Sequence, residues 1–279
     1  MKLSTTKTRM ALAAAACLCS FLVGTVSFAQ VQTQGGSVGA MQQLNSRAEI
    51  QQILQVQGKE DAAYAAFRDA KPDDLDRKIK LGQDFLGQFP NSRYAESVDV
   101  GLMNAYYAKQ DWQNFYTSAD RALALKPDEI DVLVTVGWVI PHVYDPHNPD
   151  AAKLLDKAES YEKRAIPDIE AMPKPAEMKD SQFSDFKFQK TNQAHSALGL
   201  VYFRRHDYEN SVKELQQATQ NIASPDQTDL FILATSLEKL NRRAEAAESF
   251  DRCGQIAAGL QQQCKQGAAR ARQPAAPPK

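Results

Sequence analysis

Side chains of the kinds that bind divalent cations gather in one ten-residue stretch, Pro141–Asp150. They are His142, Asp145, His147 and Asp150. Imidazole and carboxylate groups are zinc ligands, so the four are candidate metal ligands. Asp-Pro and Asn-Pro steps are also ordinary turn formers, and the central glycine and terminal glutamate of a calcium loop are absent. The sequence therefore favours a contact loop over a metal site, and we expect no cofactor.

The familiar catalytic motifs are missing. The sequence contains no glycine-rich phosphate loop, no Gly-x-Ser-x-Gly nucleophile elbow and no His-Glu-x-x-His motif. A metal-dependent enzyme would have to rely on His142 and His147. We expect a protein that is not an enzyme and keep the metal-dependent enzyme as an alternative.

The first 29 residues have the features of an export signal. Three basic residues within the first nine precede an apolar run that ends in Ser27-Phe28-Ala29, a small-x-small cleavage pattern. We expect cleavage after Ala29 and a periplasmic or secreted mature chain. One alternative is an uncleaved N-terminal membrane anchor, because the run approaches the ~20 residues that cross a bilayer. Another is lipid attachment at Cys17.

The charge of the mature chain does not indicate a polyanionic partner. Removing residues 1–29 takes away three basic residues and no acidic ones, so the formal net charge falls from −1 to −4. Neither nucleic acid nor an anionic membrane surface is favoured as a partner. No second apolar run follows, so we expect no membrane span after signal cleavage.

Signal cleavage would leave two cysteines, Cys253 and Cys264. Eleven residues along one straight helix would separate them by about 16 Å, whereas a disulfide needs Cα atoms about 5.5 Å apart. The chain must therefore turn between them, and Gly254 and Gly259 are candidate turn points. We predict a disulfide, as expected in an oxidising compartment. The alternative is that Cys253 is only a small residue at a position that requires one.

Two stretches near the C-terminus superimpose with a shift of 35 residues. The shift pairs Gly199 with Ala234, Ser211 with Ala246 and Leu215 with Phe250, so small residues match small ones and large match large. A repeat of this length is typical of a helical solenoid.

Proline followed by Asp or Asn recurs between apolar segments of helical spacing, as at Pro127-Asp128 and Pro225-Asp226. Proline ends one helix and the next side chain can cap another. We predict a solenoid over 59–264, with repeats at about 59–92, 93–129, 130–167 with the insertion 141–150, 180–225 and 227–260. Residues 30–58 form a Gln- and Gly-rich leader that we expect to be largely disordered, with 48–56 as a candidate helix. We also predict a disordered tail at 265–279.

The repeats resemble the tetratricopeptide (TPR) family, whose 34-residue helix-turn-helix unit has small residues at positions 8, 20 and 27 and large ones at 11 and 24. The last two repeats match best, with Gly199 and Ala234 at position 8 and Ala218 and Cys253 at position 27. The overall pattern is similar to exported bacterial TPR proteins. The resemblance implies an all-α, right-handed solenoid of about five helix pairs with a C-terminal capping segment.

The resemblance also implies a concave groove lined by the first helix of each pair. Where the family's carboxylate clamp has Lys and Asn, this chain has Ser196-Ala197 and Phe231-Ile232. We therefore expect an apolar and aromatic groove that binds a protein or peptide segment, as in a scaffold or adaptor. An alternative for Val134, Leu200 and Phe231 is that they only pack between repeats. An alternative function is that the chain is a structural component of a cell-envelope assembly that oligomerises or docks. The groove residues carried over are Asn104, Tyr107, Trp138, Phe203, Arg204, Thr235 and Glu238.

Overall fold

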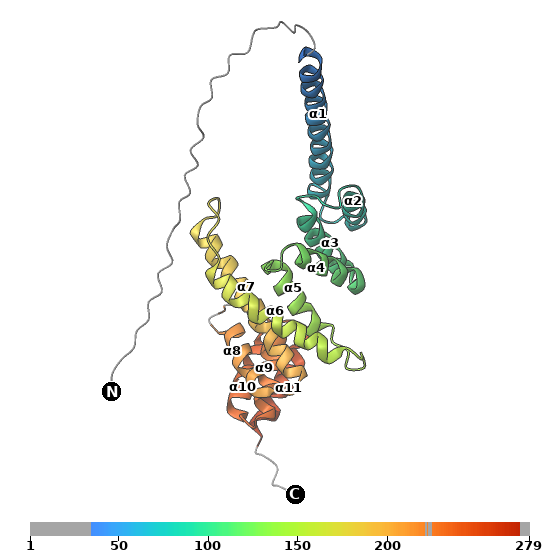
Figure 1. The fold of residues 1–279 in the computed structure, drawn as a ribbon. Helices are drawn as coiled ribbons and strands as arrows, with labels where there is room; N and C mark the ends of the chain where they lie inside the picture. The colour runs from blue at the N-terminus through green and yellow to red at the C-terminus, as the bar shows by residue number, and fades with distance from the viewer. Residues whose placement is uncertain (1–34, 221, 223–224, 274–279) are drawn as a thin grey trace, which may run out of the picture. The chain divides into compact units, whose positions relative to one another are not determined.

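The computed structural model describes residues 35–220, 222 and 225–273, which contain eleven α-helices and no strand (Figure 1). The predicted signal at 1–29 and residues 274–279 of the predicted tail lie outside the described residues. The chain divides into two units between Gln55 and Val56. Every helix among the described residues falls short of the length and apolar character needed to cross a membrane.

The helices follow one another with short connections. Their bounds are α1 Gly35–Arg68, α2 Leu75–Gln88, α3 Ala95–Lys109, α4 Trp112–Leu125, α5 Ile130–His142, α6 Ala151–Ala171, α7 Asp180–Arg204, α8 Tyr208–Thr219, α9 Gln227–Lys239, α10 Arg243–Gln255 and α11 Gln261–Arg272.

From α2 onward each helix packs against the next along the chain, and α7 also contacts both α5 and α9. The pairs α3 and α4, α5 and α6, α7 and α8, and α9 and α10 are therefore the repeating units. The first helices α5 and α7 lie against one another, and so do α7 and α9, as a stacked helical repeat requires. The prediction of an all-α solenoid is confirmed.

Polar side chains start several of the helices. Asp74, Asp111, Asp207 and Asp226 each accept a hydrogen bond from a backbone N–H in the first turn of α2, α4, α8 and α9. Such caps satisfy donors that have no partner within the helix. The sharp turns inside three repeats are made by Gln110, His206 and Asn241, with φ of 56°, 62° and 59°. These left-handed residues direct the second helix back along the first.

Close approach explains why small residues recur in the first helices. A Cβ placed on Gly199 in α7 would lie 2.4 Å from Cγ of Leu215 in α8. A Cβ on Gly137 in α5 would lie 2.3 Å from Oε1 of Glu162 in α6. Both distances are shorter than van der Waals contact, so each helix pair depends on its glycine.

Two predictions at the ends of the solenoid need correction. Residues 35–58 belong to α1, although we expected a largely disordered leader; their glutamines are good helix formers. Residues 265–272 belong to α11, although we expected a disordered tail from 265. Gly267, Ala268 and Ala271 of α11 are buried, and a Cβ on Gly267 would lie 2.6 Å from the Phe250 ring. Small residues that approach so closely need no large core former on their own helix.

The predicted insertion also begins later than expected. Helix α5 continues through Pro141 to His142, although we placed Pro141 in the loop. Pro141 is buried and cannot donate a hydrogen bond to the Gly137 carbonyl one turn earlier. The two additional helical residues place His142 on the face of α5 that holds Trp138.

Candidate functional site

A pocket of about 530 Å³ opens where α5, α7 and α9 meet beside the end of α8. It spans first helices of three successive repeats, which is the face on which we predicted a groove. A volume of this size fits a peptide side chain together with part of its backbone. The side chains that give the pocket its chemical character are Trp138, His142, Asn192, Gln193, Asp226 and Asp229.

Two aromatic rings one helical turn apart form the α5 side of the pocket. The rings of Trp138 and His142 are stacked, with centroids 3.8 Å apart and an interplanar angle of 27°. Nδ1 of His142 lies 2.6 Å from the carbonyl oxygen of Trp138. A carbonyl can only accept, so Nδ1 carries the proton and donates it. Burial lowers the pKa of His142, and the imidazole is therefore neutral at pH 7, with Nε2 as an acceptor.

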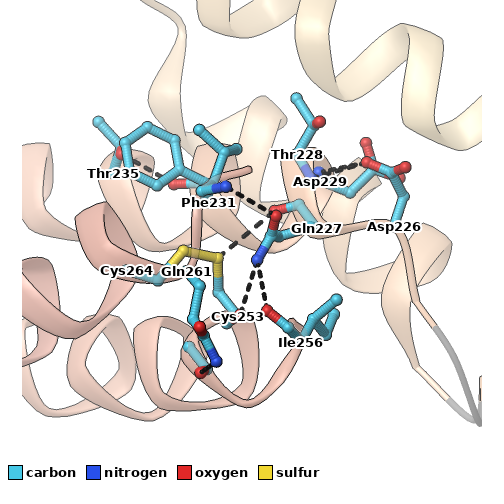
Figure 2. Close-up of a disulfide and its surroundings, with 12 residues drawn as sticks. Asp226, Gln227, Thr228, Asp229, Phe231, Thr235, Cys253, Ile256, Gln261 and Cys264 are labelled. Atoms are coloured by element: carbon cyan, nitrogen blue, oxygen red, sulfur yellow. Dashed lines mark hydrogen bonds between the residues drawn. A yellow bond between two sulfur atoms is a disulfide. The ribbon is translucent and has the colours of Figure 1, made fainter. Parts of the chain in front are cut away.

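Two carboxylates form the α9 side. Oδ1 of Asp226 accepts from the backbone N–H groups of Thr228 and Asp229, at 2.7 Å and 3.2 Å (Figure 2). Asp229 is buried, and Ser196 of α7 donates its hydroxyl to Oδ1 of Asp229 at 2.7 Å. Burial raises the pKa of Asp229 to about 7; the Ser196 hydrogen bond opposes this shift and the nearby Asp226 adds to it. The pocket thus holds two carboxyl groups, of which the buried one, Asp229, titrates near pH 7.

Among the predicted groove residues that the structure describes, Trp138 is the one that lines this pocket. Arg204 lies nearby but donates from Nε to the Pro141 carbonyl at 3.2 Å, and its guanidinium lies 5.4 Å from the centre of the Tyr144 ring. Phe203 is half-buried and packs against the Tyr208 ring, with centroids 6.0 Å apart.

The other predicted groove residues lie on first helices outside the pocket. Asn104 is exposed, and Tyr107 is 37% exposed with its ring against Trp112. Thr235 donates its hydroxyl to the Phe231 carbonyl at 2.8 Å. Glu238 pairs with Arg270 of α11 at 2.7 Å, so the C-terminal helix reaches this face. Two of the residues that we expected, as an alternative, only to pack between repeats are more buried than the groove residues. These two, Val134 and Leu200, both belong to the buried core.

The contacts inside the repeats decide the structural class. Ser211 and Ala246 at position 20, and Ala218 and Cys253 at position 27, are buried beside the first helix of their own pair or of the next. Leu215 and Phe250 at position 24 are fully buried, and Leu215 packs directly against Gly199 at position 8. The chain is a TPR-like helical repeat protein.

Comparisons with known proteins were made for sequence and for structure. No family model and no curated protein matches the sequence. A thermophilic TPR protein of Thermus thermophilus aligns with a TM-score of 0.45 at 14% identity, over 71% of this chain and 90% of its own. A tetratricopeptide repeat protein from Parabacteroides merdae gives 0.40 at 12%, over 77% and 91%. The assembly chaperone of RpL4 gives 0.42 at 10%, over 76% and 93%.

The candidate metal ligands of the predicted insertion 141–150 do not come together in this TPR-like chain. His142 stacks on Trp138, whereas Asp145 accepts from the backbone N–H of His147 at 2.9 Å. Asp150 pairs with Lys153 at 2.9 Å at the start of α6. Across the described part of the chain, no three His, Cys, Asp or Glu side chains gather as metal ligands would.

Cys253 and Cys264 face one another at the C-terminal end of the TPR-like repeat, with Cα atoms 5.7 Å apart (Figure 2). The turn between them is also held by Gln227. Its Nε2 donates to the carbonyls of Cys253 and Ile256, at 3.2 Å and 2.9 Å, and its Oε1 accepts from the Leu260 N–H at 2.9 Å. Gln227 is the first residue of α9, so the same turn supports the helix end that carries Asp226 and Asp229.

Sequence reasoning missed most of the pocket. Asn192, Gln193 and Asp229 are polar residues inside helices, and nothing in their local sequence separates them from a solvated face. Asp226 was recognised only as the cap behind Pro225. The available signal was the continuation of α5 through Pro141, which places His142 four residues after Trp138 and on the same face of the helix.

Proposed function

We propose that this TPR-like chain is an exported scaffold or adaptor that binds a segment of a partner protein along the first helices of its repeats. The observation that carries the proposal is the pocket at Trp138, where three first helices leave a space of about 530 Å³ instead of packing closed. A helical repeat whose inner face is open to solvent offers an extended surface for a partner.

Aromatic side chains on successive first helices support this surface. Tyr107 on α3, Trp138 on α5 and Phe203 on α7 are all at least partly accessible. Aromatic residues contribute large contact areas at low entropic cost and dominate many interfaces. The pocket beside Trp138 also contains carboxylate and amide groups, so the bound segment is better described as mixed in character than as purely apolar.

Export and the absence of catalysis are part of the proposal. The N-terminal sequence pattern supports a periplasmic or secreted location, and the facing cysteines are consistent with an oxidising compartment. N-terminal sequencing of the mature protein tests the predicted cleavage: a chain that starts at Gln30 supports export with removal of the signal, and one that starts at Met1 contradicts the cleavage.

Crosslinked capture from the native cell fraction tests the binding surface. A variant with Tyr107→Ala, Trp138→Ala and Phe203→Ala should lose a partner that the wild type retains. Phe188→Ala is the matched control, because Phe188 is 47% exposed but belongs to neither the pocket nor the predicted groove. Circular dichroism must show that the variant folds. An unchanged set of captured proteins would overturn the groove assignment.

A second candidate function is self-association as part of an envelope assembly. Helix α1 favours it, because Ile50, Ile53 and Leu54 are 56%, 56% and 59% exposed and lie on one side of the helix. Exposed apolar patches of this kind mark interfaces. Light scattering of the wild type should show a defined oligomer. A variant with Ile50→Gln, Ile53→Gln and Leu54→Gln should be a monomer. A monomeric wild type would exclude self-association as the function.

A further inference from the structure

We propose that the pocket beside Trp138 accepts a basic side chain of the partner segment, with arginine fitting best. The inference deepens the proposed function and rests on it. It concerns the place where the C-terminal end of α5, the middle of α7 and the N-terminal end of α9 meet.

The charges that line the pocket are negative. Asp226 and Asp229 both contribute to its wall, and among the described lining residues none is Lys or Arg. Asp226 receives both of its backbone hydrogen bonds on Oδ1, so among the described residues Oδ2 has no hydrogen-bond donor and can accept from a ligand. Ser196 likewise donates to only one oxygen of Asp229. A guanidinium donates in a fork and pairs well with two such oxygens.

The remaining walls suit the same group. The stacked rings of Trp138 and His142 present an aromatic surface, and tryptophan attracts cations through its π system more strongly than other side chains. Asn192 and Gln193 of α7 supply amide oxygens that can accept from N–H donors. His142, neutral and donating through Nδ1, adds no positive charge to the pocket.

An anionic ligand fits less well. The N-terminus of α9 would normally attract an anion, but Asp226 already occupies its free N–H groups. Arg204, the basic side chain near His142, is engaged by the Pro141 carbonyl and the Tyr144 ring. A carboxylate in the pocket would face two aspartates without a cation to balance it.

Binding can be measured with short capped peptides. In a Trp112→Phe background Trp138 is the only tryptophan, so its fluorescence and its indole N–H resonance report on the pocket alone. The probes are acetyl-Ala-Arg-Ala-amide and its Gln and Glu counterparts. We expect saturable shifts with the Arg peptide and at least tenfold weaker binding of the other two. Added salt should weaken the Arg complex.

Two conservative variants test the carboxylates. Asp226→Asn keeps a good helix cap, and Asp229→Asn can still accept from Ser196, so both should fold. Each should weaken binding of the Arg peptide about tenfold or more. Asp185→Asn, an exposed acid on α7 away from the pocket, is the matched control and should change nothing. Equal binding of the Arg and Gln peptides, or Asn variants that bind as the wild type does, would overturn the inference.

The same variants separate this inference from the scaffold proposal. If partner capture is lost on changing Tyr107, Trp138 and Phe203 but survives both Asn variants, the scaffold proposal stands and the basic-side-chain inference fails. If the Arg peptide binds through Asp226 and Asp229 while partner capture ignores the aromatic residues, the pocket is real and the scaffold proposal fails.

Discussion

At the scale of single residues, Asp229 and Glu162 are buried acids whose surroundings disfavour ionisation. Asp229 is hydrogen-bonded to Ser196 and faces the pocket, whereas neither carboxyl oxygen of Glu162 has a hydrogen-bond partner among the described residues. Burial raises the pKa of both. The first acid borders the candidate site. The second lies in the interior at position 24, where the next two repeats have Leu215 and Phe250.

Asp229→Asn should make the protein less sensitive to rising pH. The pKa of Asp229 is about 7 in the fold against an ordinary 3.8, so the native state holds a proton that the unfolded chain releases between these values. Wild-type stability therefore falls as pH rises through this window, and the Asn variant lacks this fall. Asp226, His142 and Ser196 face the group in both proteins. From pH 5 to pH 8 the variant should gain roughly 2 to 4 kcal/mol relative to wild type.

Urea denaturation at pH 5 and pH 8 measures this difference. Asp185→Asn, which removes an exposed carboxylate from α7, should show no such change between the two pH values. A stability difference between Asp229→Asn and wild type that stays constant with pH would mean that Asp229 ionises at its ordinary pKa.

Glu162→Met should stabilise the protein. Burying a polar group without a hydrogen bond costs about 1 to 3 kcal/mol in mutational data, and methionine fills similar space without that cost. The gain should be larger at pH 8 than at pH 5, because the raised pKa of Glu162 makes its native form lose relative stability above the ordinary 4.5. Glu170→Met on the exposed side of α6 serves as the comparison. A less stable Glu162→Met protein would indicate a partner for this carboxyl.

At the scale of elements, the bounds of the repeat helices follow from local chemistry. One repeat was predicted at about 93–129, and its two helices are observed at Ala95–Lys109 and Trp112–Leu125. Asp111 caps α4 and Gln110 makes the turn before it. Residues next to one another in the sequence therefore determine both where α3 ends and where α4 begins. Helix α11 was missed because its burial depends on Phe250 from another helix, and residues within α11 give no apolar signal of their own.

The candidate site was less predictable for the same reason. Trp138 stood out by its type and repeat position, but Asp229 acquires its role only from Ser196 on α7 and from burial between helices. Contacts between elements that are distant in sequence decide such a pocket. A periodic pattern places a residue on a face of its own helix and does not place the neighbouring helix.

Gly199→Ala tests the close approach of α7 and α8. Alanine favours an isolated helix by about 1 kcal/mol over glycine, but here its Cβ would lie 2.4 Å from Leu215 Cγ. Overpacking should dominate and destabilise the protein by about 1 to 3 kcal/mol. Gly87→Ala in α2 is the matched control, because nothing lies within 4 Å of its added Cβ, and it should be neutral or stabilising. Thermal unfolding followed by circular dichroism compares the two; equal behaviour would show that the helices can separate at little cost.

At the scale of the whole molecule, a helical repeat needs a closed end, because each unit is buried only by its neighbours. Helix α11 covers Phe250 and the last pair, and its Arg270 reaches Glu238 on α9. The turn before α11 is held by Gln227 and by the pair Cys253 and Cys264. The stability of this end therefore bears on the pocket, since Gln227 begins the helix that carries Asp229.

Reduction of the cysteine pair should destabilise the protein and act mainly on its C-terminal end. Closing a loop of this length contributes about 3 kcal/mol by the chain-entropy estimate. Denaturation with and without dithiothreitol measures the loss, and hydrogen exchange should show lost protection concentrated in α10 and α11. Cys253→Ala is the control, because reductant should not affect its stability. Gln227 still holds the turn after reduction, so the Arg peptide should keep measurable affinity. Two free thiols per chain in the purified native protein would contradict the disulfide, and Cys253 would then serve only as the small residue that its repeat position requires.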